Sequence, residues 1–207
     1  MKSALDRFNE ALRSNLQAFA LELSEETLTQ LGEFYSLLAR WNDRLHLVAP
    51  CTPEEFAVRH LLESLMLLSI LPQQARIADV GSGAGLPIIP CLIARPDLEA
   101  TLVESSQKKG VFLREALNVV GRRAAIISRR FEEIEPPPVS FVSCRALDQF
   151  VQKLPELISW APTGCKLLFF GGDSLREQLQ EARLTFDETL IPLSERRFLF
   201  EATNQLE

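Results

Sequence analysis

The fold is decided by residues 77–87, which read IADVGSGAGLP. A short apolar strand runs into three alternating glycines, and an apolar stretch typical of a helix comes next. Glycines carry no Cβ, so the backbone here can turn sharply and come close to a ligand. The free N–H groups and the positive dipole end of the following helix suit a carboxylate or a phosphate. The stretch therefore predicts a loop that binds a nucleotide-type cofactor.

The spacing of the glycines separates two kinds of nucleotide loop. A dinucleotide fingerprint reads G-x-G-x-x-G, and its third glycine would fall on Leu86. The observed order is G-x-G-x-G after Asp79, which is typical of the S-adenosylmethionine loop of class I methyltransferases. The next apolar run ends in Glu104, and an acid there can accept both hydroxyls of an adenosine ribose. A nicotinamide or flavin cofactor, and a glycine-rich turn without any ligand, remain as alternatives.

Strands and helices alternate from residue 76 onward. We expect strands at 76–80, 99–104, 124–128, 139–143, 166–170, about 184–191 and about 196–202, and helices at 86–94, 106–120, 146–160 and 173–182. This alternation predicts a Rossmann-like α/β fold with a mostly parallel seven-stranded sheet and an antiparallel C-terminal strand. The preceding part has the period of three helices, the third starting after residues 52–55 (TPEE) and ending at Pro72. We expect a helical extension at 1–74 packed on a cofactor-binding core at 75–207.

Composition describes an ordinary globular protein, in which 46% of the residues are hydrophobic and 24% are charged. No apolar run approaches the roughly 18 residues of a membrane span, and the first residues contain no signal-peptide core. The four cysteines are scattered and there are only two histidines, which disfavours both a disulfide framework and a metal site. We expect a reduced, cytoplasmic monomer that binds no metal and no membrane.

The distribution of charge points to a local contact with phosphates. The net charge of −6 argues against a protein that is basic over its whole surface. Residues 106–130, however, contain seven basic residues and one acid, which gives this segment a charge of +6 (7 − 1). A basic stripe on an acidic body can hold phosphates locally. Lys108, Lys109 and Arg114 are therefore candidate RNA contacts, and a solvated helix face is the alternative.

Several motifs occur in a fixed order along the chain. They are Trp41-Asn42, VRHLLES at 58–64, the loop at 79–87, Glu104-Ser105, Lys108-Lys109, Phe112-Leu113, SRRFEE at 128–133, and Cys144-Arg145-Ala146. Together they resemble the glucose-inhibited division protein B family, whose members methylate N7 of a guanine in small-subunit (16S) ribosomal RNA. The resemblance covers nearly the whole chain. It implies S-adenosyl-L-methionine as the cofactor and small-subunit ribosomal RNA, or the 30S particle, as the partner.

The resemblance also implies roles for single residues. Gly81 and Leu86 would contact the cofactor, Phe131 and Glu132 would flank its adenine, and Arg145 would lie where cofactor and substrate meet. Arg59 and His60 would lie at the mouth of the pocket, where they would help Arg145 to position the substrate. With the chemical reasoning on the loop and on the ribose, the expected cofactor-binding residues are Asp79, Gly81, Gly83, Gly85, Leu86, Glu104, Phe131, Glu132 and Arg145.

The chemistry that the resemblance implies demands little acid–base catalysis. N7 of guanine carries a lone pair and no proton, so its methylation needs alignment rather than a general base. The sequence accordingly shows no obvious Asp/His or Cys/His pair and no Asn/Asp-Pro-Pro-Tyr motif. The chain departs from the family pattern at His46, Val48, Ile88 and Phe170, mostly on the side expected to face RNA. The alternatives are a diverged methyltransferase with another RNA or a small-molecule substrate, and a non-catalytic cofactor-binding module.

Overall fold

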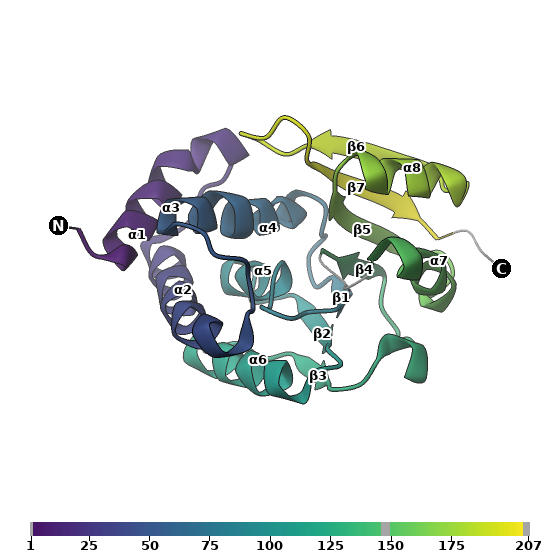
Figure 1. The fold of residues 1–207 in the computed structure, drawn as a ribbon, viewed down its shortest axis with the longest axis horizontal. Helices are drawn as coiled ribbons and strands as arrows, with labels where there is room; N and C mark the ends of the chain where they lie inside the picture. The colour runs from purple at the N-terminus through teal and green to yellow at the C-terminus, as the bar shows by residue number, and fades with distance from the viewer. Residues whose placement is uncertain (1, 146–149, 205–207) are drawn as a thin grey trace.

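The computed structural model describes residues 2–145 and 150–204, which are built around a seven-stranded sheet with the order β3-β2-β1-β4-β5-β7-β6 (Figure 1). The strands are β1 (Arg76–Val80), β2 (Glu99–Val103), β3 (Ala125–Ile127), β4 (Phe141–Cys144), β5 (Lys166–Gly171), β6 (Phe186–Leu190) and β7 (Phe198–Thr203). β7 runs antiparallel to both β5 and β6, whereas β1–β2, β1–β4, β2–β3 and β4–β5 are parallel pairs. This arrangement confirms the predicted fold class.

A hydrophobic core covers each face of the sheet. Successive side chains of a strand point to opposite faces, so the same strand contributes to both cores. Ile77 and Leu168 belong to the hydrophobic core on one face, and Ala78 and Phe169 to the core on the other. Helices α5 (Ile88–Ala94) and α6 (Gln107–Val119) contribute to the first core, together with the N-terminal helices. Helices α7 (Phe150–Trp160) and α8 (Asp173–Glu181) contribute to the second. The start predicted for α7, at residue 146, lies outside the described residues.

The order of the strands creates a place for a ligand at one edge of the sheet. The chain leaves β1 toward β2 on one side, and later returns to pair β4 with the other side of β1. In doubly wound sheets, such a reversal opens a crevice at the carboxyl ends of the strands. The glycine loop, Glu104 and Arg145 directly follow β1, β2 and β4. The topology therefore brings three predicted site elements to one edge.

The N-terminal helices pack on the α5–α6 face of the sheet (Figure 1). Helix α1 (Ala4–Asn15) starts with a capping box, in which Ser3 and Asp6 satisfy each other's backbone N–H groups. Helix α2 (Glu25–Leu45) contacts both α5 and α6. The rings of Phe8 and Tyr35 stack with their centroids 4.3 Å apart and join α1 to α2. This packing buries the apolar stripes that the helical periods predicted.

The third predicted helix is composite. Its parts are α3 (Pro53–Phe56), a π-helical segment (Ala57–Leu62), α4 (Glu63–Leu65) and a 3-10 turn (Met66–Ser69). The helical residues end before Pro72, as predicted, but they begin at Pro53, earlier than predicted, because Thr52 caps the start through a capping box with Glu55. The π-helical segment differs from the regular helix expected from the apolar period. Such segments are rare and frequently occur at functional sites, and this one carries Arg59 and His60.

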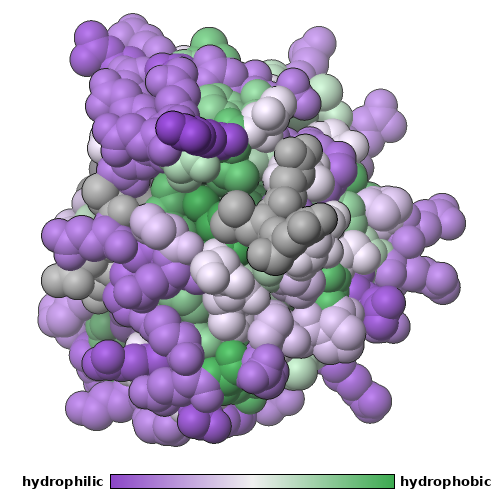
Figure 2. Space-filling view, turned by 90° about the vertical axis from the view of Figure 1, so that its right-hand side faces the viewer, coloured by the Kyte–Doolittle hydropathy of each residue, from purple (hydrophilic) through white to green (hydrophobic). Residues whose placement is uncertain are grey.

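The surface is mostly hydrophilic on the face shown in Figure 2, which is the right-hand side of Figure 1. Hydrophilic residues occupy most of its outline, and the most extensive hydrophobic area lies in the upper and central part of this face. Among the helices that the structure describes, none is long and apolar enough to cross a membrane.

Candidate active site

The glycine loop adopts backbone conformations that favour glycine at all three positions. Gly81, Gly83 and Gly85 have φ values of 73°, 46° and 76°, which lie in the left-handed region. The N–H of Gly81 donates to the carbonyl of Val103 at 2.9 Å, so the loop is held against the end of β2. A Cβ on Gly85 would lie 2.5 Å from Cδ1 of Ile89. Gly85 is thus required for packing on α5, whereas Gly81 and Gly83 line a pocket.

Glu104 fastens the loop to the start of α6. Its Oε2 accepts a hydrogen bond from the N–H of Gly83 at 2.8 Å, and its Oε1 accepts one from the N–H of Ser106 at 2.7 Å. The side chain is almost fully buried but still borders the pocket. Each carboxylate oxygen can accept a second hydrogen bond, so Glu104 can bind ribose hydroxyls while it holds the loop.

Asp79 lies beneath the loop and is 1% exposed. Its Oδ1 accepts a hydrogen bond from Oγ of Ser143 at 2.7 Å, whereas its Oδ2 has no partner among the described residues. Burial raises the pKa of Asp79 to about 7, although the hydrogen bond from Ser143 opposes the rise. A buried carboxylate oxygen without a donor is costly. A cationic or hydrogen-bond-donating ligand group would compensate it.

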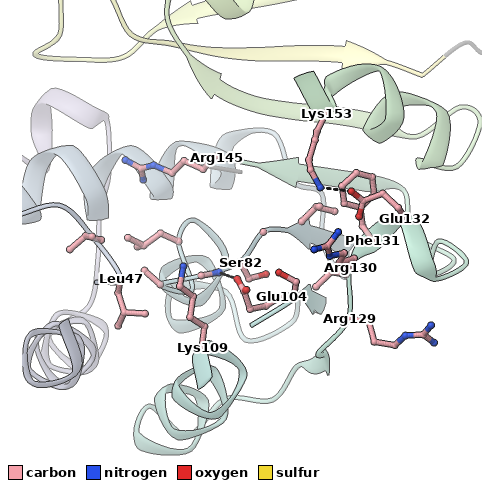
Figure 3. Close-up of a pocket in the computed structure, with 18 of the residues that line it drawn as sticks. Leu47, Ser82, Glu104, Lys109, Arg129, Arg130, Phe131, Glu132, Arg145 and Lys153 are labelled. Atoms are coloured by element: carbon pink, nitrogen blue, oxygen red, sulfur yellow. Dashed lines mark hydrogen bonds and ion pairs between the residues drawn. The ribbon is translucent and has the colours of Figure 1, made fainter. Parts of the chain in front are cut away.

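A pocket of about 570 Å³ opens above the loop. Its lining includes the predicted residues Gly81, Gly83, Leu86, Glu104, Phe131, Glu132, Arg145, His60 and Lys109. Asp79 lies below the loop, Gly85 packs on α5, and Arg59, Lys108 and Arg114 are exposed outside the lining. In Figure 3, Leu47 and Arg145 lie on one side of the pocket, and Phe131 and Glu132 lie on the other.

The Phe131–Glu132 side of the pocket is fixed by a lysine from α7. Lys153 forms an ion pair with Glu132, and its Nζ lies 5.6 Å from the centroid of the Phe131 ring (Figure 3). Burial opposes the ionisation of Glu132, but the hydrogen bond from Lys153 contributes to a net lowering of its pKa. Glu132 is therefore ionised at neutral pH. The lysine thus holds an aromatic ring and a carboxylate side by side in this wall of the pocket.

Arg145 lines the opposite side of the pocket but directs its guanidinium to the π-helical segment (Figure 3). Nη1 donates to the carbonyl of His60 at 2.9 Å and to Oγ of Ser64 at 3.0 Å, and Nη2 donates to the carbonyl of Arg59. Nη2 also donates to Oε2 of Glu63 at 3.0 Å. Burial lowers the pKa of Arg145 to about 10, so it remains charged at neutral pH.

His60 borders the pocket as a neutral side chain. Burial lowers its pKa to about 4, and the neighbouring Arg145, Arg59 and Arg197 act in the same direction, against a smaller effect of Glu55. The imidazole is therefore neutral at pH 7. Its ring packs against Phe56, with the two centroids 5.2 Å apart.

The segment 47–49 forms part of the wall that sequence reasoning did not assign. Leu47, Val48 and Ala49 line the pocket. Asn42 fixes this segment, because its Oδ1 accepts from the N–H of Val48 at 2.9 Å and its Nδ2 donates to the carbonyl of Val48 at 3.1 Å. His46, one of the departures from the family pattern, has a φ of 48° at the end of α2. Histidine, like asparagine, is enriched in that conformation, so this departure is compatible with the turn.

Arg129, Arg130, Ser105 and Lys153 are further lining residues that were not assigned to the site from the sequence. The motif at 128–133 contained the two arginines and could have indicated them. No local signal could have indicated Lys153, because its place depends on the packing of α7 against the 3-10 turn Phe131–Glu133.

The basic segment 106–130 divides into residues with different roles. Arg122 donates to the carbonyls of Leu92 and Ile93 and to the side chain of Gln30, which is a structural role. Lys109, Arg129 and Arg130 line the pocket, and Lys108 is exposed beside it on α6. Only part of the positive charge is therefore available at the pocket. Within the described ranges, no group of three or more His, Cys, Asp or Glu residues could hold a metal ion.

Comparisons with known proteins agree with this geometry. The family model described as "rRNA small subunit methyltransferase G" (GidB) matches residues 27–194. The ribosomal RNA small subunit methyltransferase G of Gluconobacter oxydans (strain 621H) is 37% identical over 164 residues, which are 77% of this chain and 82% of that protein. The protein of the same name from Halorhodospira halophila (strain DSM 244 / SL1) is 36% identical over 172 residues, or 82% and 81% of the two chains.

The likeness to solved structures concerns the fold. A SAM-dependent methyltransferase from Aquifex aeolicus has a TM-score of 0.59 and 14% identity, over 81% of this chain and 97% of the other. A methyltransferase from Pyrococcus furiosus has the same TM-score of 0.59 with 10% identity, over 86% and 99% of the two chains.

Proposed function

Because the chain belongs to the GidB family of rRNA small subunit methyltransferase G proteins, we propose that it transfers a methyl group from S-adenosylmethionine to N7 of a guanine in small-subunit ribosomal RNA. The observation that carries the proposal is the pocket itself. A glycine loop, the buried Glu104, an aromatic–acid pair and several cations meet there, at the carboxyl ends of β1, β2 and β4.

The residues of the pocket fit S-adenosylmethionine. Asp79, below the loop, has a buried carboxylate oxygen with no donor among the described residues, and we assign this oxygen to the ammonium of the methionine part. Glu104 would accept the ribose hydroxyls, and Phe131 with Glu132 would hold the adenine. Gly81 and Gly83 let the backbone approach the cofactor closely. When bound, S-adenosylmethionine supplies a methyl group activated by its positively charged sulfur.

The protein's own contribution to the transfer is alignment and electrostatics. The lone pair of N7 needs no base, so the pocket must bring the guanine to about 3–3.5 Å from the methyl group and in line with the bond that breaks. The purine gains positive charge as it is methylated. Because His60 is neutral, it places no further positive charge beside the purine. Arg145 is charged, but it forms an ion pair with Glu63. Leu47, Val48 and Ala49 would help to exclude water from this side.

The RNA would be held by the cations around the pocket. Lys109 and Arg130 line it, and Lys108 and Arg114 lie on the exposed face of α6. Such contacts are attractive for phosphates and depend on salt rather than on base sequence. We further infer that the protein works as a cytoplasmic monomer on the RNA or the 30S particle. The helices at 1–74 then serve as an extension that forms one side of the pocket.

A transfer assay with a loop variant tests the proposal. Purified protein and radiolabelled S-adenosylmethionine are incubated with small-subunit RNA from cells that lack the modification, and cofactor binding is measured by calorimetry. Gly81→Val should abolish cofactor binding and labelling together, since Gly81 lines the pocket with a φ of 73°. Labelling that persists in the variant would show that the loop is not the cofactor site. Labelling of another RNA or of a small molecule would favour a diverged methyltransferase, and binding without transfer would favour a non-catalytic module.

A further inference from the structure

One buried carboxylate joins three parts of the chain that are distant in sequence. Glu63 is 2% exposed and directly follows the π-helical segment. Its Oε2 accepts a hydrogen bond from Arg145, after β4, at 3.0 Å. Its Oε1 lies 2.5 Å from Nη1 of Arg197, which directly precedes β7. The β6–β7 connection, the end of β4 and the π-helical segment therefore meet at this side chain.

The same network fixes a wall of the pocket. Arg145 donates to the backbone carbonyls of Arg59 and His60 as well as to Glu63, so its guanidinium is hydrogen-bonded to the backbone of the π-helical segment. His60 and Arg145 both line the pocket, and Arg145 lies on the side opposite Phe131 and Glu132 (Figure 3). A shift of Arg145 would move the carbonyls that it holds, and with them the imidazole at the pocket.

Stability alone gives a weak reason for burying these charges. Burial raises the pKa of Glu63, and burial lowers that of Arg145, so each charge is present despite an unfavourable environment. Buried ion pairs are often no more stabilising than apolar residues of the same volume, whereas they impose a defined geometry. The contacts of Glu63 impose such a geometry on one wall of the pocket.

We propose that Glu63 is a positioning residue for methyl transfer, which holds Arg145 and Arg197 so that the His60 side of the pocket keeps a fixed shape for the base. The inference rests on the proposed function, because it assigns that side to the methyl acceptor. We expect the affinity for the cofactor, which we assign to Glu104 and Phe131, to be independent of Glu63.

The first test is kinetic and uses the full chain. Glu63→Gln should lower kcat for RNA methylation by about 10- to 100-fold, the loss expected when reacting groups are misplaced by about an ångström. The affinity for S-adenosylmethionine should stay unchanged. Arg196→Gln is the matched control, since it removes one charge from the same connection, where the Arg196 side chain is exposed. A wild-type kcat in folded Glu63→Gln, or an equal loss of cofactor affinity, would overturn the inference.

The second test needs no activity. The chain has two histidines, so the imidazole signals of His60 and His46 can be followed separately by NMR, with His46 as the internal reference. Loss of a nearby negative charge can only lower the pKa of a histidine. A rise of the His60 pKa in Glu63→Gln, from about 4 toward 6.5, would therefore report that its turn has been released. A pKa that does not rise would show that the turn is held without Glu63.

A third variant keeps the kinetic test decisive. If Glu63→Gln does not fold, Arg197→Met replaces it, because Glu63 then retains its hydrogen bond to Arg145. This variant should still lower kcat relative to Arg196→Gln, and an unchanged kcat would refute the inference. If the wild-type protein fails to label RNA, the proposed function fails, and the NMR titration still decides whether Glu63 holds the turn.

Discussion

Replacing Gly85 by alanine separates a packing role from a binding role within one loop. The new Cβ would lie 2.5 Å from Cδ1 and 2.9 Å from Cγ1 of Ile89, and 3.3 Å from Cδ2 of Leu113. Ile89 is fully buried and β-branched, so its side chain has little freedom to move away. Gly85 also has a φ of 76°, which an L-residue adopts only with strain.

The magnitude is the sum of two effects. The left-handed backbone costs about 1–2 kcal/mol for a residue with a Cβ, and the overpacking costs about 1–3 kcal/mol. Gly85→Ala should therefore reduce the free energy of unfolding by about 2–5 kcal/mol. For a chain of this size, each kcal/mol lowers Tm by about 2–4 °C. Gly121→Ala is the control for backbone strain, because Gly121 has a φ of 62° and its Cβ would meet nothing within 4 Å.

The assay compares three variants by thermal unfolding and by calorimetric titration with S-adenosylmethionine. Gly83→Ala completes the set, since its Cβ would make only ordinary contacts, 3.6 Å from the carbonyl of Gly81 and 3.9 Å from Oε2 of Glu104. We expect Gly85→Ala to lose the most stability, and Gly83→Ala to lose cofactor affinity with a stability close to that of Gly121→Ala. Equal destabilisation by Gly85→Ala and Gly121→Ala would refute the packing role of Gly85.

Three further variants test other parts of the account. The raised pKa means that folded wild-type protein keeps the proton of Asp79 up to about pH 7, whereas the unfolded chain loses it above about pH 3.8. The stability that this proton contributes is therefore full below about pH 3.8 and is lost as the pH rises through about 7. The unfolding free energy of Asp79→Asn minus that of the wild type should therefore increase by roughly 4 kcal/mol over this range, in denaturant titrations. Arg122→Ala should cost about 1.5–3 kcal/mol by the same assay, because it leaves buried carbonyls without donors, and should not change cofactor affinity. Lys108→Glu with Arg114→Glu should raise KM for RNA and reduce its salt dependence; an unchanged KM would count against this surface.

The sequence predicted the sheet and the loop well because both depend on local patterns. β1 was predicted at 76–80 and is found at Arg76–Val80. Its four buried residues follow an exposed Arg76, and the three glycines that follow have positive φ values, which glycine adopts readily. The antiparallel pairing of β7 was predicted from the short connection after β6, which the structure contains at 191–197.

What the sequence missed depends on contacts between distant segments. The π-helical segment has the apolar period of a regular helix, and nothing local signals that Arg145, more than 80 residues away, will bind its carbonyls. The pairing of Lys153 with Glu132 requires α7 to pack beside the 3-10 turn. Arg122 looked like its basic neighbours, although its donors are used inside the fold. Lys108 and Arg122 could therefore not be told apart by charge.

Identification of the methylated atom tests the central claim most directly. Small-subunit RNA labelled by the purified protein is treated with the strand-cleavage chemistry that follows N7 methylation of guanine, and the cleavage products are mapped. The proposed N7 methylation predicts label at a guanine and cleavage at that nucleotide, because attack by N7 needs alignment and no general base. Label that resists this cleavage, or that lies on an exocyclic amine or a ribose hydroxyl, would contradict the account.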